Sequence, residues 1–330
     1  MTGAGSGLGG SCFHGAAWAK VLVGTYGFRP VYFQAVRGDR IEALLPCMEV
    51  SGWLTGRRGV SLPFTDHCRS LGSGAAELQA VYAEALRHGK KRGWKSLECR
   101  GGGAGFEDVR PSISFYGHLL ELGPDSDGLF AGFEGSVRRA IRKARNSGLT
   151  LDVSGELSAV EDYYGLHCQT RRRHGLPPQP FRFFRELQRH VLGPGLGWVV
   201  SARWGGRSVA SAIFLVHGEE AVYKFGASDA AGRERCANHL VMWHAMEWLA
   251  GRGVKRLDFG RSPEANEGLR RYKLGWGAEE ERLNYYKYDF RSRRHVTEQD
   301  AAFGWHNRVF QRLPLGVARL AGELLYRHWA

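Results

Sequence analysis

The chain has 330 residues, of which 43% are hydrophobic and 24% are charged; this composition is that of a globular protein and excludes an intrinsically disordered one. The 46 lysines and arginines exceed the 33 aspartates and glutamates, which gives a formal net charge of +13. Such an excess suits phosphate-bearing or nucleic-acid partners, and it equally serves solubility alone. The 6 cysteines are scattered and form no C-x-x-C pair, a pattern typical of a reducing compartment.

The sequence predicts neither a signal peptide nor a membrane span. Residues 1–13 are expected to be a flexible lead, because their start is rich in Gly and Ser and has no basic or apolar region. A spanning helix needs about 18 or more consecutive apolar residues, and no stretch approaches this. We therefore expect a cytoplasmic protein.

An internal repeat predicts the architecture. Residues 92–99 read Arg-Gly-Trp-Lys-Ser-Leu-Glu-Cys, and residues 252–259 read Arg-Gly-Val-Lys-Arg-Leu-Asp-Phe. A predicted helix precedes each segment, over 76–91 and 238–250, and a hairpin candidate lies further upstream of each. The order helix, three strands, helix, two strands occurs twice, so we expect a duplicated α/β unit with mixed sheets.

The first domain is expected over 14–123 and the second over 124–290. The second should open with one helix, capped by Asp125 or Asp127, whose apolar residues recur on a single face. That apolar stripe consists of Phe130, Phe133, Val137, Ile141 and Ala144.

A helical, basic tail over 291–330 is expected to pack on the first domain. From residue 300 onward apolar residues alternate with arginines, and Pro314 breaks the pattern. Two interpretations stay open: the tail covers an exposed core face, which is the commoner case, or it lies on a membrane surface as a basic amphipathic helix.

The sharpest candidate site follows the strand predicted over 254–259. Leu269, Tyr272 and Trp276 are spaced to bury one face of a short helix, while Arg270 and Lys273 share a neighbouring face at the edge of a cleft. A cation held there could stabilise negative charge on a reacting carbonyl oxygen. The alternative is an ordinary solvated basic face.

Several segments resemble FemAB-like (FemABX) proteins of the GNAT acyltransferase superfamily. The resemblance rests on Asp258-Phe-Gly-Arg-Ser262 followed by Tyr272-Lys273 and Trp276-Gly277-Ala278-Glu279, on the basic helix from Arg138 to Ala144, and on Ser61-Leu-Pro-Phe-Thr-Asp66. The tail around Arg312-Leu-Pro-Leu315 resembles FemAB-like proteins of exosortase-linked polysaccharide loci.

The resemblance implies a tandem GNAT fold and an enzyme that transfers an acyl or aminoacyl group to an amine. FemAB-type enzymes take an aminoacyl group from its tRNA ester to a cell-wall precursor, and related members use acyl-CoA. By this resemblance Lys273 stabilises the oxyanion and Tyr272 packs the donor end. The residues expected to bind substrate are Arg261, Arg270, Arg138, Arg142, Asp66, Lys224 and Trp276.

No tightly bound cofactor is expected; acyl-CoA or aminoacyl-tRNA would be a co-substrate. In a CoA-dependent GNAT a Gly-rich turn at a helix N-terminus holds the pyrophosphate. The equivalent turn over 232–239 has Arg233 and Arg235 but lacks two of the usual small residues, and Asn238 fits a plain N-cap equally well. The long coiled-coil arm of some Fem proteins is also missing from the sequence.

The remaining candidates are weaker. Glu98 and Asp258 end equivalent predicted strands and could orient or deprotonate an amine, or satisfy a nearby backbone group. The adjacent Asp66, His67 and Cys68 cannot all face one metal ion in a strand, so no metal site is expected.

The expected partners are an anionic donor, either a tRNA acceptor end or CoA, and a sugar- or peptide-linked amine acceptor. The protein is expected to be a monomer or dimer, and a contact with the inner face of a membrane stays open. The alternative function is a non-catalytic binding or assembly factor for exopolysaccharide or cell-surface export.

Overall fold

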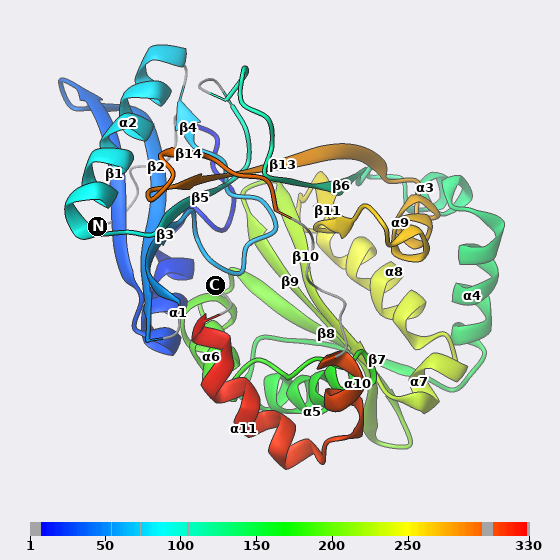
Figure 1. The fold of residues 1–330 in the computed structure, drawn as a ribbon. Coiled ribbons are helices and arrows are strands. Elements are labelled where there is room, and N and C mark those ends of the chain that lie inside the picture. The colour runs from blue at the N-terminus through cyan, green and yellow to red at the C-terminus, as the bar shows by residue number, and fades with distance from the viewer. Residues whose placement is uncertain (1–7, 54, 73, 104–105, 299–305, 329–330) are drawn as a thin grey trace. The chain divides into compact units, whose positions relative to one another are not determined.

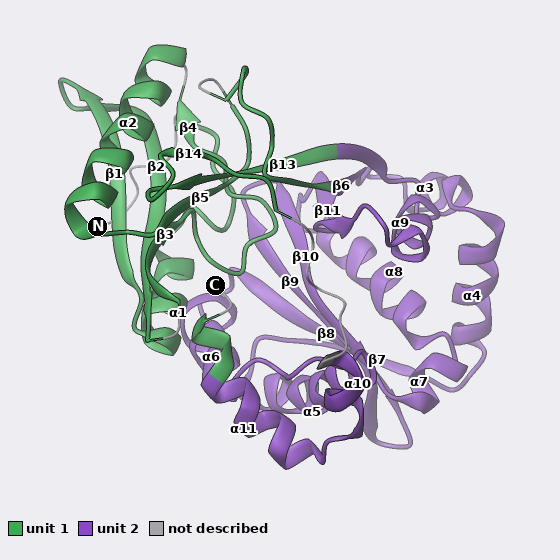
Figure 2. Cartoon of the chain, viewed as in Figure 1, with its two compact units in different colours: residues 1–115, 282–301, 325–330 green, residues 116–281, 302–324 purple. Residues whose placement is uncertain are grey.

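The computed structural model describes residues 8–53, 55–72, 74–103, 106–298 and 306–328 (Figure 1). The chain divides into two compact units, which are described separately (Figure 2). Unit 1 holds residues 1–115, 282–301 and 325–330, and unit 2 holds residues 116–281 and 302–324. Both are mixed α/β structures, as the sequence predicts.

Unit 1 is a mixed sheet with strand order β1-β2-β3-β5-β13 and a long helix, α2, against it. The core lies between α2 and the sheet, where Leu78, Val81 and Ala85 of α2 pack with Leu45 and Leu97. The elements of unit 1 are α1 (Ala16–Tyr26), β1 (Arg29–Arg37), β2 (Arg40–Gly52), β3 (Gly56–Val60), β4 (Leu71–Gly72), α2 (Ala75–Arg92), β5 (Ser96–Arg100), the start of β6 (Ile113–Glu121), most of β13 (Glu279–Asp289), β14 (Arg294–His295) and η2 (Tyr326–His328).

Unit 2 has the strand order β6-β11-β10-β9-β8-β7, with α5 and α8 on opposite faces of the sheet (Figure 1). The elements before its sheet centre are α3 (Ser126–Gly132), α4 (Gly135–Arg145), β7 (Thr150–Ser154), α5 (Leu157–Arg173), α6 (Phe181–Leu187), η1 (Gln188–Leu192) and β8 (Gly197–Trp204). The others are β9 (Arg207–His217), β10 (Glu220–Ser228), α7 (Ala230–Glu234), α8 (Ala237–Ala250), β11 (Arg256–Asp258), β12 (Ser262–Pro263), α9 (Glu267–Leu274), α10 (His306–Arg312) and α11 (Leu315–Leu325).

The repeated motif occupies equivalent places in the two units. In unit 1, β5 follows α2 and runs parallel to β3, and their pairing ends at Val60↔Glu98. In unit 2, β11 follows α8 and runs parallel to β10, and their pairing ends at Val222↔Asp258. The two acidic residues that the repeat aligned therefore sit at the same register position.

The last strand of each copy pairs in the other unit's sheet. The strand β6 follows β5 in the chain, yet it pairs antiparallel with β11, as in Leu120↔Leu257. The strand β13 follows β11 in the chain and pairs antiparallel with β5, as in Tyr286↔Cys99. The units consequently divide inside these strands, at 115/116 and 281/282, and not at the loop near 123 or at 290.

The start of the second copy differs from the single helix expected. Helix α3 ends at Gly132, its C-cap residue Phe133 has an extended backbone, and α4 begins at Gly135. The side chain of Asp125 caps α3 by accepting from the backbone nitrogens of Asp127 and Gly128. The apolar stripe survives this break, because Phe133 and the buried face of α4 enter one core.

Most of the described tail belongs to unit 2 and not to the first domain. Asn307 of α10 donates to the carbonyl of His174 (3.3 Å), and Gln311 donates to that of Arg173 (3.3 Å). The rest of the described tail, at its start and at its end, belongs to unit 1, where Arg58 donates to the carbonyl of His328 (2.7 Å). The expected apolar residue Phe303 lies outside the described residues.

Candidate functional site

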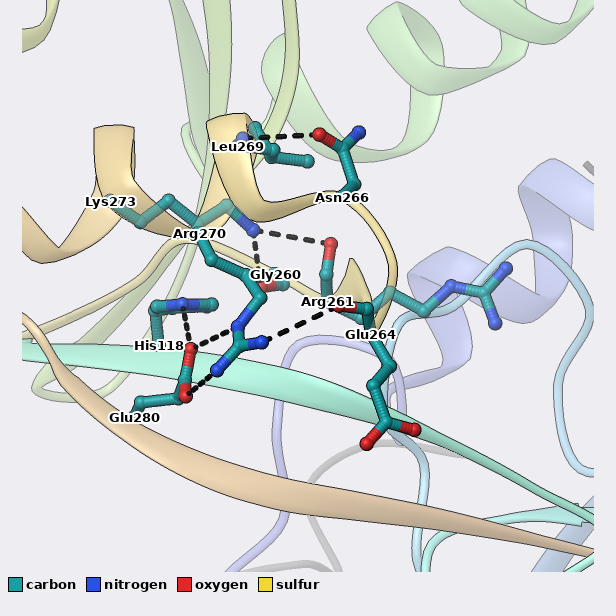
Figure 3. Close-up of polar contacts among 9 residues, drawn as sticks. All are labelled: His118, Gly260, Arg261, Glu264, Asn266, Leu269, Arg270, Lys273 and Glu280. Carbon is teal, nitrogen blue, oxygen red and sulfur yellow. Dashed lines mark hydrogen bonds and ion pairs between the residues drawn. The ribbon is translucent and has the colours of Figure 1, made fainter. Parts of the chain in front are cut away.

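Lys273 lies near the end of α9 and reaches back to the segment that leaves β11 (Figure 3). The side chain of Asn266 caps this helix by accepting from the backbone nitrogen of Leu269 (3.1 Å). Lys273 is 3% exposed, and its Nζ donates to the carbonyls of Gly260 (2.7 Å) and Arg261 (3.1 Å). The ammonium is therefore buried and clamps the backbone after β11, which differs from both the cleft-edge position and the solvated face considered from the sequence.

A polar network surrounds this clamp. Glu280 receives two hydrogen bonds from Arg270 (2.9 and 2.7 Å), and one of its oxygens lies 3.0 Å from Nε2 of His118 (Figure 3). The guanidinium of Arg270 also stacks over the ring of Tyr116 at 3.9 Å. Arg270 is thus held by protein groups on two sides.

The electrostatics of the network follow from burial and pairing. Hydrogen bonds from Arg270 hold the pKa of Glu280 below its usual range. Burial lowers the pKa of His118, and the nearby charge of Lys273 lowers it further, so the imidazole is neutral at pH 7. Its Nδ1 is buried without a hydrogen-bond partner among the described residues.

Tyr272 and Trp276 take different places in the aromatic core of unit 2. Trp276 is fully buried, stacks on His239 at 5.8 Å and contacts Phe133, so it supports the site from the core and presents no surface to a substrate. Tyr272 is half-buried, and its ring meets that of His239 at 5.5 Å. Burial raises the pKa of Tyr272, which keeps its hydroxyl protonated.

The strand β10 continues past its pairing with β11. That pairing covers three residues and ends at Val222, whereas β10 runs on to Ser228. Lys224 forms a bulge opposite β9, between Tyr223 and Phe225. Bulges commonly occur next to active sites because they redirect side chains and interrupt pairing. A ligand could therefore meet backbone groups of this central strand.

Tyr223 has its side chain along this part of β10, beyond the pairing with β11. A Cβ at Gly226 would lie 1.8 Å from its hydroxyl oxygen, so the phenol lies directly over the glycine. Burial raises the pKa of Tyr223 to about 12. The predicted substrate residue Lys224 instead places its Nζ over the ring of Phe225 at 5.4 Å.

The two acidic residues that the repeat aligns, Glu98 and Asp258, each accept a hydrogen bond from a protein group. Asp258 accepts from the backbone nitrogen of Gly260 (2.7 Å), which stabilises the turn after β11. Glu98, in unit 1, accepts from Nε of Arg100 (2.7 Å). Asp66 also lies in unit 1, where its backbone carbonyl accepts from the hydroxyl of Tyr285.

The three residues predicted to bind a cofactor, Arg233, Arg235 and Asn238, have different surroundings around the start of α8. The helix begins after Cys236, so Asn238 is its second residue and not its N-cap; its Nδ2 donates to the hydroxyl of Ser228 (3.0 Å). Arg235 stacks over Trp204 at 3.7 Å. Arg233 alone borders the larger pocket of this region.

That pocket encloses about 510 Å³ and is rich in arginine. Arg173 and Arg233 both donate to the carbonyl of Ser228, at 3.1 and 3.3 Å, so two guanidinium groups converge on one oxygen. The acidic side chain at the pocket, Asp229, is bound to Arg207 (2.8 Å). The lining residues are Gln169, Arg172, Arg173, Ser228, Asp229, Ala230, Arg233 and Gln311.

The other predicted arginines are dispersed over unit 2. Arg142 is exposed on α4, with its guanidinium over Phe130 at 5.6 Å, and Arg138 is half-buried on the same helix. The side chain of Arg261 extends away from the His118–Glu280 pair, and its carbonyl accepts from Lys273 (Figure 3).

A comparison with known protein families matches the part of the chain that holds Lys273, Tyr223 and the arginines of the pocket. Residues 132–288 match the family model described as an acetyltransferase (GNAT) domain. The chain carries a GNAT-type acetyltransferase domain. A comparison of the whole sequence with curated proteins gave no match.

Solved structures show the same fold over most of the chain. The crystal structure of FemX aligns with a TM-score of 0.68 at 12% identity, over 84% of this chain and 91% of that one. A tandem GNAT protein from the clavulanic acid biosynthesis pathway aligns with a TM-score of 0.53 at 13% identity, over 82% and 87% of the two chains. L-PGS from Bacillus licheniformis aligns with a TM-score of 0.55 at 12% identity, over 96% and 93%. These likenesses establish a tandem GNAT fold.

Sequence reasoning missed three side chains of unit 2, namely His118, Glu280 and Tyr223. His118 and Glu280 belong to strands that were assigned to separate domains, so nothing in the sequence placed them beside Lys273. Tyr223 carried a weak signal, since it precedes Lys224, which the resemblance had already suggested as a substrate-binding residue. Among the described residues no group of three or more His, Cys, Asp or Glu could hold a metal ion.

Proposed function

We propose that this protein transfers an acyl or aminoacyl group from an ester or thioester to an amine. The observation that carries the proposal is the GNAT-domain match, which spans the bulged part of β10 beyond its pairing with β11. Backbone groups in such a segment can pair with an extended donor as an added strand would. Lys273 fixes the segment leaving β11 at the neighbouring position.

The reaction needs positioning and charge stabilisation and no protein nucleophile. The amine nitrogen attacks the carbonyl carbon, a C–N bond forms and the C–O or C–S bond of the donor breaks. The departing oxygen or sulfur gains a proton, and the amine loses one to solvent. We assign the proton donor role to Tyr223, because its hydroxyl lies over Gly226, on the part of β10 that continues beyond the pairing with β11.

Lys273 contributes in one of two ways under this proposal. Its ammonium could stabilise the oxyanion directly, as the resemblance to FemAB-like proteins implies. Its hydrogen bonds to Gly260 and Arg261 could instead hold the backbone against which the donor packs. Both roles predict lower turnover when the ammonium is removed.

The arginine-lined pocket supports a phosphate-bearing donor. Two guanidinium groups on one carbonyl repel each other, and a bound phosphate would offset that repulsion through bidentate hydrogen bonds. CoA and the acceptor end of tRNA share this phosphate chemistry. We propose that the acceptor is an amine of a cell-envelope or polysaccharide precursor, which the resemblance favours.

Binding of CoA and of uncharged tRNA tests the donor site without requiring turnover. Replacing Arg233 with Gln should weaken binding of the true donor by roughly ten- to a hundredfold, the range for a lost charge-assisted phosphate contact. Arg235→Gln is the matched control, because that side chain stacks on Trp204 outside the pocket. Equal loss in both variants, or binding of neither donor, would contradict the assignment.

Turnover tests the proposed reaction itself. The purified chain should release free thiol from acyl-CoA, or free tRNA from aminoacyl-tRNA, only when a primary amine acceptor is present. The donor that binds is the one that should react. A protein that binds donor tightly and transfers nothing to any amine would favour a non-catalytic binding factor.

A further inference from the structure

Helix α11 packs on unit 2 through its small residues. Ala318 and Gly322 are buried, and a Cβ at Gly322 would lie 2.0 Å from the carbonyl oxygen of Pro178. The side chain of Arg319 rests over the ring of Tyr164 at 5.2 Å. The helix is therefore held close to the protein along one face, which fixes the direction of its other side chains.

The opposite face of α11 is an apolar row open to solvent. Val317, Leu320 and Leu324, spaced i, i+3 and i+7, are 49%, 58% and 64% exposed. The last two are the most exposed aliphatic side chains among the described residues. In the amphipathic helix α4 the apolar residues are buried and the cations face solvent. On α11 the apolar row itself faces solvent, which marks an interaction surface and not core cover.

The charged residues of α10 and α11 are mostly positive. Arg308 and Arg312 of α10 and Arg319 of α11 are all exposed. Residues 306–324 contain a single acidic residue, Glu323. An apolar row in a segment whose exposed charges are mostly arginines complements a surface that is apolar within and anionic at its boundary.

We propose that α11 docks on an anionic membrane surface, with Val317, Leu320 and Leu324 inserted at the boundary between headgroups and acyl chains. No helix among the described residues is long and apolar enough to cross a membrane, so the contact is peripheral. A net charge of +13 draws the protein to such a surface, and the apolar row supplies the attachment that charge alone does not. This surface is independent of the acyl-transfer proposal.

Vesicle sedimentation tests the surface with the full-length protein. It should bind vesicles rich in phosphatidylglycerol and bind vesicles of phosphatidylcholine alone at least about tenfold more weakly. The double variant Leu320→Glu, Leu324→Glu should lower partitioning to the anionic vesicles by about a hundredfold, because two apolar insertions are lost and two negative charges are added. Leu196→Glu is the control, since Leu196 is 44% exposed outside the tail.

A second variant separates the insertion of the apolar row into the membrane from the electrostatic attraction of the basic protein to anionic lipid. Arg308→Glu, Arg312→Glu should weaken binding in low salt and leave the protein folded, because both side chains are exposed. Equal binding of wild type and the Leu320→Glu, Leu324→Glu variant would overturn the proposal, as would a wild-type protein that ignores both vesicle types. A wild-type dimer that this variant converts to a monomer, with no vesicle binding by either, would identify a second copy as the occupant instead.

Discussion

Replacing Lys273 with Met tests whether the buried ammonium holds the active segment together. Methionine keeps the length of the side chain and removes its charge and its donors. The carbonyls of Gly260 and Arg261, at 2.7 and 3.1 Å from Nζ, would lose a hydrogen bond each. Because Lys273 is 3% exposed, water cannot easily replace the missing donor.

The expected cost follows from these two contacts. A hydrogen bond to a charged group contributes about 1.5–3 kcal/mol, and the variant is spared the cost of burying an ammonium. We therefore expect the free energy of unfolding to fall by roughly 2–4 kcal/mol. If Lys273 also stabilises charge in the transition state, kcat should fall on the order of a hundred- to a thousandfold while donor binding stays nearly intact.

Urea unfolding should be measured before turnover, so that activity is compared at a temperature where both proteins are folded. Lys255→Met is the matched control: the side chain of Lys255 is 65% exposed, and its loss should change stability by less than about 0.5 kcal/mol. Lys273→Arg should rescue only partly, because a larger, planar group must enter a closed site. A Lys273→Met protein with wild-type stability and turnover would refute both the clamp and the catalytic role.

Three further outcomes are expected. Gly226→Ala should force the Tyr223 hydroxyl aside and cost about 1–3 kcal/mol in urea unfolding, whereas Gly165→Ala, with open space around its Cβ, should not destabilise. Tyr223→Phe should lower kcat without changing the unfolding midpoint; equal kcat would remove it as proton donor. Burial, followed by the charge of Arg69, lowers the pKa of His67 to about 4, so the unfolded chain takes up a proton below pH 6.5 where the folded one does not. Stability should therefore fall by up to about 2 kcal/mol between about pH 7 and pH 5, and His67→Gln should remove that slope.

The repeat and the resemblance predicted the fold because both depend on local patterns. The pattern Arg-Gly-x-Lys-x-Leu followed by an acidic residue indicates the end of a helix and then a buried strand. Neither feature depends on which strand lies next to it in the sheet. The register equivalence of Glu98 and Asp258 confirms that part of the interpretation. Strand partners are not encoded locally, so the sequence could not show β6 in the sheet of unit 2.

The same limit explains the side chains that were misplaced. Helical spacing put Arg270 and Lys273 on one shared face at the edge of a cleft, but the environment of that face depends on distant residues. Glu280 pairs with Arg270, whereas Lys273 is buried with its Nζ on the carbonyls after β11. Trp276 followed its apolar spacing into the core, which is where a substrate residue cannot be. Spacing therefore predicted the burial of Trp276 and not that of Lys273.

The exchange of last strands also explains why one copy of the fold cannot make this site. The strand β6 comes from the first copy and brings His118 beside β11 and Lys273, while the start of β13 brings Glu280 from the second. The pairing of these two side chains at 3.0 Å thus joins residues 162 positions apart in the chain. Without β6 the strand β11 would have an open edge, and Glu280 would lose one of its two partners. The polar network around Lys273 therefore combines side chains on a strand from each copy.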